Sequence, residues 1–305
     1  MNALRCLVAF VTLALSAGAA EPLVVAANPV LADIVRQIAG TTVEVDVLLP
    51  EGALSREFEV NEEVARKLSN AALFVVNGAG YEPWLEQLLK LTSYTGPVLE
   101  ATENVPLYDQ AGGLHQPEVA EGAKNLFEAT DLDPFAWHDP RNVVLYAESV
   151  ARTLATFLPA EKLKVIDANL VTFSADLRAA HAFAQEKLAT IPAAKRRLVT
   201  PYDAFRYFSI AYSLPVTPIP GIASGTEPRP AALERLLTMI TQTRATAVFL
   251  EKGANLRTLQ RITSETGAKT VTTLVAEGLG PVGSPTGTYL GMFRANVTAI
   301  ADALK

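Results

Sequence analysis

The strongest constraint on the fold is a regular alternation of short apolar stretches with longer amphipathic ones. In the first hundred residues, four stretches are typical of buried β-strands: LVVAAN (23–28), VEVDVLLP (43–50), ALFVVNG (72–78) and PVLEAT (97–102). The stretches between them predict helices, with Pro29 in a first turn, Gly40 at a C-terminal end and Asn61 as an N-cap. This order predicts a mostly parallel sheet covered by helices on both faces.

A second alternation follows a long helical region, residues 142–192. Its last stretch, from residue 160, would reach about 45 Å at 1.5 Å per residue. We therefore predict an α/β fold of two Rossmann-like lobes with mostly parallel sheets, joined by one long backbone helix. The N-terminal lobe would cover residues 21–141, including a variable loop at 102–132, and the C-terminal lobe residues 193–305. Such lobes bind a ligand between them, where loops at the carboxyl ends of their strands converge.

Residues 1–20 are expected to be a cleaved signal peptide. They contain one early positive charge, Arg5, an apolar run from Leu7 to Leu15, and small residues up to Ala20. That run is too short for a stable membrane anchor, so the mature protein is expected in the periplasm. Cys6 is the only cysteine and would be lost with the signal. A metal site in the mature chain would need histidines, carboxylates or hydroxyls.

Charge and motif content exclude several classes of function. The formal net charge of −6, without a long basic run, argues against a nucleic-acid partner. The chain contains three histidines, and neither a full dinucleotide-binding fingerprint nor a GxSxG nucleophile motif. We therefore expect a binding protein and not an enzyme.

Several segments, in order, resemble the periplasmic metal-binding proteins of zinc- and manganese-type ABC importers. They include NPVLADIVRQIAG, LLPEGALSREFEV, NGAGYEPWLEQLL, DPFAWHDPRNV, TPYDAFRYFSIAYSL, TEPRPAALERL and TYLGMFRANVTAIADAL. The resemblance covers nearly all of the mature chain. It implies two lobes bridged by a rigid helix, one divalent zinc or manganese ion between them, and an ABC permease in the inner membrane as partner. We expect a monomer.

The resemblance also implies a ligand set that this chain has changed. The family usually holds its ion with three histidines and a carboxylate. The three histidine positions fall on Arg56, Phe135 and Tyr202, and the carboxylate position falls on Glu277. Imidazole nitrogen binds Zn²⁺ and Mn²⁺ well, whereas a phenyl ring donates nothing and a guanidinium stays protonated. We therefore expect these four residues to line the cleft without forming the usual metal site.

Three hypotheses follow for the altered cleft. A displaced set could hold a metal, with His138 and Glu277 as candidate ligands and neighbouring groups such as Glu57, Glu59, Asp139 and His115. Alternatively, Arg56 and Glu277 could neutralise each other, giving an accessory or scaffold protein. Finally, the arginine and the aromatic rings could bind a small organic anion or a metal chelate. The sequence leaves these open, and for His138 a local role beside an Asp139–Pro140 helix start is also reasonable.

Overall fold

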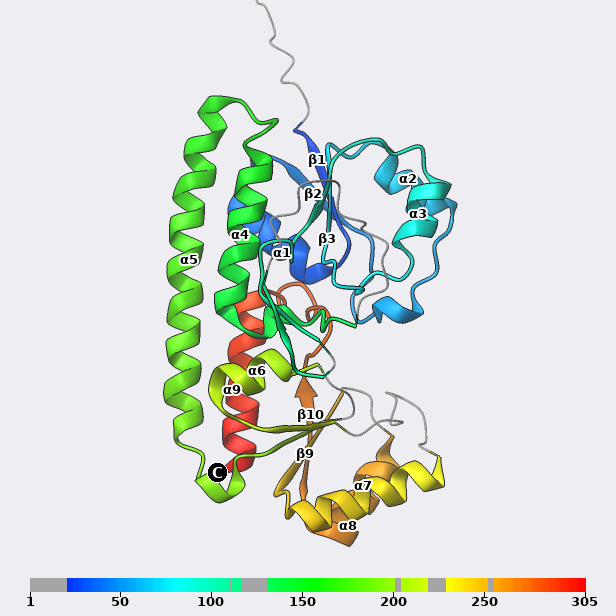
Figure 1. The fold of residues 1–305 in the computed structure, drawn as a ribbon, viewed down its shortest axis with the longest axis vertical. Coiled ribbons are helices and arrows are strands. Elements are labelled where there is room, and N and C mark those ends of the chain that lie inside the picture. The colour runs from blue at the N-terminus through cyan, green and yellow to red at the C-terminus, as the bar shows by residue number, and fades with distance from the viewer. Residues whose placement is uncertain (1–20, 110, 117–130, 201–203, 219–228, 252–254) are drawn as a thin grey trace, which may run out of the picture.

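The computed structural model describes residues 21–109, 111–116, 131–200, 204–218, 229–251 and 255–305 (Figure 1). The predicted signal peptide lies outside these residues. Two α/β halves lie one above the other along the longest axis of the molecule. Among the described residues, no helix is long and apolar enough to cross a membrane.

The N-terminal half is built on one parallel sheet, as the alternation predicts. Its strand order is β2-β1-β3-β4, with every neighbouring pair parallel. The strands are β1 (Leu23–Ala26), β2 (Glu44–Val47), β3 (Leu73–Val76) and β4 (Val98–Glu100). The helices are α1 (Pro29–Ala39), α2 (Glu62–Ser69) and α3 (Leu85–Leu91). Helix α1 lies on the side of α4 and α5, and α2 and α3 lie on the other side (Figure 1).

The predicted helix boundaries of this half are confirmed by the capping contacts. Asn28 precedes α1, and its side chain accepts a hydrogen bond from the Leu31 amide. Asn61 accepts hydrogen bonds from the amides of Glu63 and Val64 at the start of α2. The side chains of such residues satisfy amides that have no partner inside the helix.

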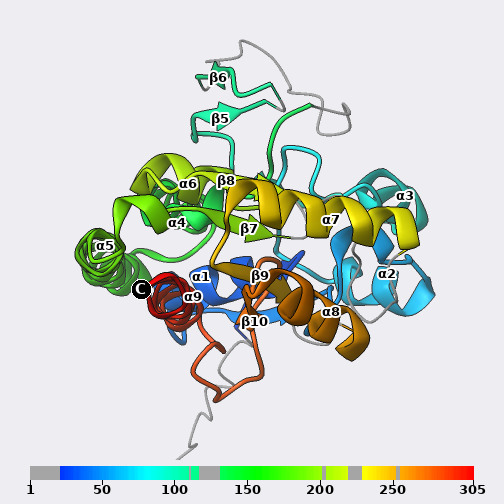
Figure 2. The ribbon, with the colours of Figure 1, turned by 90° about the horizontal axis from the view of Figure 1, so that it is seen from below.

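The predicted loop at 102–132 contains regular structure that the sequence did not indicate. Strands β5 (Leu107–Tyr108) and β6 (Leu114–His115) form a short antiparallel hairpin that extends from the body of the molecule (Figure 2). Because each strand has two residues, the segment is too short to show a period of alternation.

One long helix runs beside both halves, which confirms the predicted backbone helix. Helix α5 (Ala160–Ala189) has 30 residues, and it follows α4 (Pro140–Leu154). It packs against α1 and α4 at one end and against α6 and α9 at the other. The boundaries proposed for the lobes, at residues 141 and 193, stay a prediction.

The C-terminal half contains two parallel strand pairs. The strands are β7 (Leu198–Thr200), β8 (Val216–Pro218), β9 (Ala247–Glu251) and β10 (Lys269–Leu274). Strand β7 pairs with β8 and strand β9 with β10, and β7 lies close to β9. The helices are α6 (Arg206–Tyr212), α7 (Pro230–Thr243), α8 (Leu256–Thr266) and α9 (Tyr289–Leu304). Helices α7 and α8 lie on the side of this half that faces away from α5.

The two halves share a hydrophobic core. One cluster of buried residues runs from β1 and α1 through α4 and α5 to α6, β9, β10 and α9. Its largest fully buried side chains include Trp137, Tyr146 and Tyr289. A smaller cluster joins α7 and α8 to β9. Since the larger cluster crosses from one half to the other, wide separation of the halves would expose much apolar surface.

Candidate functional site

An ion pair joins the two halves at the positions that the sequence singles out. Nη1 of Arg56 lies 3.0 Å from Oε1 of Glu277. The two side chains differ sharply in exposure: 52 % for Arg56 and 4 % for Glu277. Nε of Arg56 also lies 3.7 Å from Oε1 of the exposed Glu57. The arginine therefore meets a buried carboxylate on one side and an exposed one on the other.

Neighbouring contacts fix the backbone that carries Arg56. Arg56 lies in the single-turn helix η1 (Ser55–Glu57), in the loop after β2. The buried Ser55 hydroxyl donates to the Tyr81 carbonyl oxygen and accepts a 3.2 Å hydrogen bond from Nε1 of Trp84. The Trp84 ring also packs edge-on against Phe58 at 5.0 Å between centroids. These contacts hold the loop, while the Arg56 side chain extends toward the other half.

Phe135 belongs to a trio of mutually perpendicular aromatic rings. The centroid distances are 6.1 Å between Tyr81 and Phe135, 5.4 Å between Phe135 and Trp137, and 5.2 Å between Tyr81 and Trp137. Burial raises the pKa of Tyr81, the negative charges of Glu277 and Glu82 raise it further, and the positive charge of Arg56 opposes them. The charges of Arg56 and Glu277 therefore both act on the pKa of the Tyr81 hydroxyl. Perpendicular packing of this kind stabilises aromatic clusters.

Tyr81 is a site residue that the sequence analysis missed. It follows β3 at the carboxyl end of the sheet. Loops at the carboxyl ends of parallel strands form the ligand crevice in such folds, so this position was a usable signal.

Tyr202, the fourth predicted cleft residue, lies outside the described residues. The structure thus brings together Arg56, Glu277 and the ring cluster that contains Phe135.

The buried ring of His138 links the two halves by a hydrogen bond to a backbone carbonyl of the C-terminal half. His138 is 1 % exposed, and its Nε2 lies 3.0 Å from the carbonyl oxygen of Ala276, the neighbour of Glu277. Because a carbonyl only accepts, Nε2 carries the proton. Burial lowers the pKa of His138 to about 4, so the ring is neutral at pH 7. Its ring also packs 4.4 Å from that of Phe205.

Two of the groups that could accompany His138 in a displaced metal site, Asp139 and His115, have other partners. Asp139 caps α4 and forms an ion pair with Arg141 at 2.6 Å, as the predicted helix start requires. His115 pairs with Asp109 in the exposed hairpin, at 2.8 Å. Within the part of the chain that the structure describes, no three histidines or carboxylates are close enough to hold a metal ion.

His181 of the long helix also has a partner on another element, because its Nδ1 lies 2.9 Å from the Tyr212 hydroxyl of α6. Burial lowers the pKa of His181. Both tryptophans, Trp84 and Trp137, are buried.

An open hollow of about 530 Å³ lies against the loop that carries Arg56. Pro50, Gly52 and Leu54 contribute to its wall, and the exposed carboxylates of Glu57 and Glu59 also line it. The surroundings of Arg56 are therefore acidic on both its buried and its exposed side.

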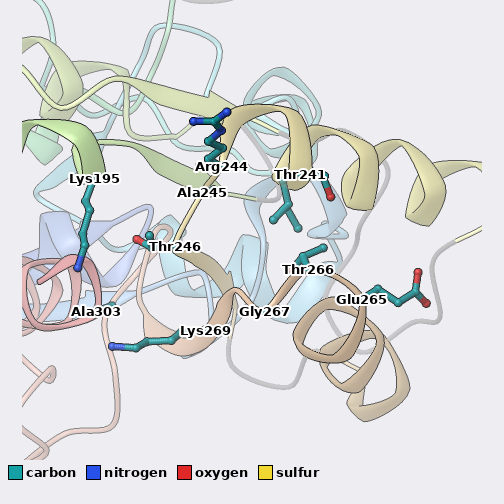
Figure 3. Close-up of a pocket in the computed structure, with 11 residues that line it drawn as sticks. Lys195, Thr241, Arg244, Ala245, Thr246, Glu265, Thr266, Gly267, Lys269 and Ala303 are labelled. Carbon is teal, nitrogen blue, oxygen red and sulfur yellow. The ribbon is translucent and has the colours of Figure 1, made fainter.

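A second hollow of about 530 Å³ lies in the C-terminal half (Figure 3), and neither Arg56 nor Glu277 lines it. Lys195, Arg244 and Lys269 line it, together with threonines of α7 and α8. Arg244 is the C-cap of α7, and Gly267 that of α8. Helix C-termini carry partial negative charge that attracts cations, so the basic side chains are explained by the fold.

Comparisons with known proteins identify the family and the fold of this chain. The family model described as "Zinc-uptake complex component A periplasmic" matches residues 24–303. The metal ABC transporter substrate-binding lipoprotein SloC of Streptococcus mutans is 27 % identical over 285 residues, with 92 % of this chain and 89 % of SloC covered. The manganese ABC transporter substrate-binding lipoprotein PsaA of Streptococcus pneumoniae is also 27 % identical over 285 residues, with coverages of 92 % and 88 %.

Among solved structures, the periplasmic zinc-binding protein TroA of Treponema pallidum is similar throughout. Its TM-score is 0.77 at 25 % identity, covering 93 % of this chain and 99 % of TroA. A periplasmic metal-binding protein of Candidatus Liberibacter asiaticus has the same fold, with a TM-score of 0.74 at 21 % identity and coverages of 93 % and 100 %. With a family model matched over almost its entire length, this chain belongs to the ZnuA family, the substrate-binding proteins of metal ABC transporters.

Proposed function

We propose that this chain is the exported substrate-binding component of a zinc- or manganese-type ABC importer, with a cargo site that has lost the usual imidazole ligands. The signal peptide would be cleaved, and the monomeric protein would deliver its cargo to a permease in the inner membrane. Family membership supports the transport role. The cleft residues would be Arg56, Phe135, Tyr202 and Glu277.

The main support for an altered cargo site is the 3.0 Å contact between Arg56 and Glu277. In the family pattern these positions hold a histidine and a carboxylate that bind one ion. A guanidinium there cannot donate an electron pair, and its positive charge repels a metal ion that approaches the same carboxylate. We infer that first-row metals bind this protein far more weakly than a site with three imidazoles would bind them.

The charges around the cleft disfavour a small organic anion as the cargo. Among the residues that the structure describes around this pair, Arg56 supplies one positive charge, whereas Glu277, Glu57 and Glu59 supply three negative ones. An anion that approaches the arginine would meet these carboxylates as well. A second candidate, an accessory protein with permanently closed lobes, is favoured by the same ion pair, because the guanidinium already supplies the positive charge that the buried Glu277 carboxylate requires.

Calorimetry on chelator-stripped protein tests the proposal. Titration with Zn²⁺ and with Mn²⁺ should give no stoichiometric binding in the submicromolar range. One-to-one binding in that range would contradict the altered site while leaving the transport role intact. Two other results would support the accessory role instead. One is that no permease gene lies beside the gene for this protein, and the other is that no ligand raises its melting temperature.

A further inference from the structure

We propose that Arg56 is a tethered cation that occupies the cargo position at Glu277, so that a cationic cargo enters only when the arginine side chain leaves. The inference rests on the proposed function, because it takes the space around Glu277 as the cargo site. It assigns Arg56 as the residue that sets which cargo is accepted.

The first support is the unequal burial of the two partners. Glu277 is 4 % exposed, so its charge requires a cation beside it. Arg56 is 52 % exposed, and its long side chain begins in a loop on the opposite half of the protein. The carboxylate is therefore the fixed partner and the guanidinium the one that can move.

The second support is that Glu277 is held in place independently of Arg56. His138 binds the carbonyl of Ala276, directly before Glu277, and both residues are buried. The amide of Val275 donates to Oδ1 of Asn296 in α9, at 3.0 Å. Departure of Arg56 would thus leave the Glu277 backbone where it is, ready for another cation.

The third support is an alternative partner for the arginine. Glu57 lies 3.7 Å from Nε of Arg56 and is 67 % exposed, and Glu59 lies in the same loop. A guanidinium that leaves Glu277 can therefore pair with carboxylates nearer the solvent. The exchange replaces one carboxylate partner by another, so that both charged groups stay compensated.

The chemical class of the cargo follows from what it must replace. It has to be a cation that satisfies the buried carboxylate of Glu277. A divalent metal ion and a small organic cation both meet this requirement. Either would compete with the guanidinium for the same oxygen atom.

Calorimetry with the variant Arg56→Ala tests the inference, using Zn²⁺, Mn²⁺ and methylguanidinium as separate probes. Removal of the tethered cation should tighten binding of at least one probe by at least about tenfold relative to wild type. The gain should disappear in Arg56→Ala/Glu277→Gln. Arg66→Ala, an exposed arginine on α2, is the matched control and should bind like wild type.

Unchanged binding of all three probes by a folded Arg56→Ala protein would overturn the inference. If that variant does not fold, Arg56→Gln keeps a polar side chain, shorter than that of arginine, without its charge, and the same comparison applies. Submicromolar metal binding by the wild type would instead contradict the proposed altered site, so failures of the two proposals are distinguishable.

Discussion

The backbone amide of Tyr289 donates a 2.8 Å hydrogen bond to Oδ2 of Asp33, 256 residues earlier in the chain. Asp33 is a buried residue of α1, and Tyr289 is the first residue of α9. The Tyr289 hydroxyl also donates to the Trp137 carbonyl oxygen at 2.8 Å. The C-terminal helix is thus anchored on the N-terminal half by buried hydrogen bonds, independently of any cargo.

Replacement of Asp33 should reveal this anchor. Asp33→Ala leaves the Tyr289 amide without its acceptor, so we expect a loss of about 1–3 kcal/mol in the free energy of unfolding. Asp33→Asn retains an acceptor oxygen and should cost clearly less, because burial already raises the pKa of Asp33 and disfavours its charged form. Urea unfolding of both variants provides the comparison. Equal losses of unfolding free energy in the two variants would indicate that the charge of Asp33, and not its hydrogen bond to Tyr289, stabilises the protein.

His138 should make the protein sensitive to acid. Burial lowers the pKa of this histidine from 6.5 to about 4. Its contribution to stability is therefore fully present above pH 6.5 and is lost as the pH falls toward 4, with a slope of at most about 1.4 kcal/mol per pH unit. His138→Gln can still donate to Ala276 but does not titrate, so its stability should fall less over this range. The exposed His115→Gln is the control and should follow the wild-type pH profile.

Gly78 should tolerate no side chain. Its φ is +83°, and a Cβ there would lie 2.1 Å from Cγ of the buried Glu100. Gly52 has a similar φ of +74° but no atom within 4 Å of such a Cβ. Gly78→Ala should therefore destabilise the protein by about 2 kcal/mol more than Gly52→Ala, which introduces the backbone strain alone. Thermal unfolding of the two variants measures the difference. Similar melting temperatures would show that the Glu100 side chain moves aside at little cost in stability.

Features encoded locally were predictable from the sequence. The helix starts at Pro29 and Pro140 follow from proline in a first turn and from Asn28 and Asp139 as caps, all within a few residues. The β5–β6 hairpin escaped prediction because its two-residue strands show no periodicity.

Contacts between distant elements were predictable only in part. The meeting of Arg56 and Glu277 was one of several hypotheses, and it depended on the family resemblance. Nothing local to His181 indicates Tyr212, and nothing local to His138 indicates Ala276. Such pairs are determined by how the two halves pack, which a single sequence read by periodicity and capping does not specify.

The central claim is that a guanidinium occupies the place of an ion beside Glu277. A crystal structure of chelator-treated protein soaked with equimolar Zn²⁺, with anomalous data collected at the zinc edge, tests it most directly. We predict no anomalous peak between the lobes and a hydrogen bond from Arg56 to Glu277. A zinc peak at another position between the lobes while Arg56 still contacts Glu277, or an Arg56 side chain far from Glu277 with no ion beside the carboxylate, would contradict the claim.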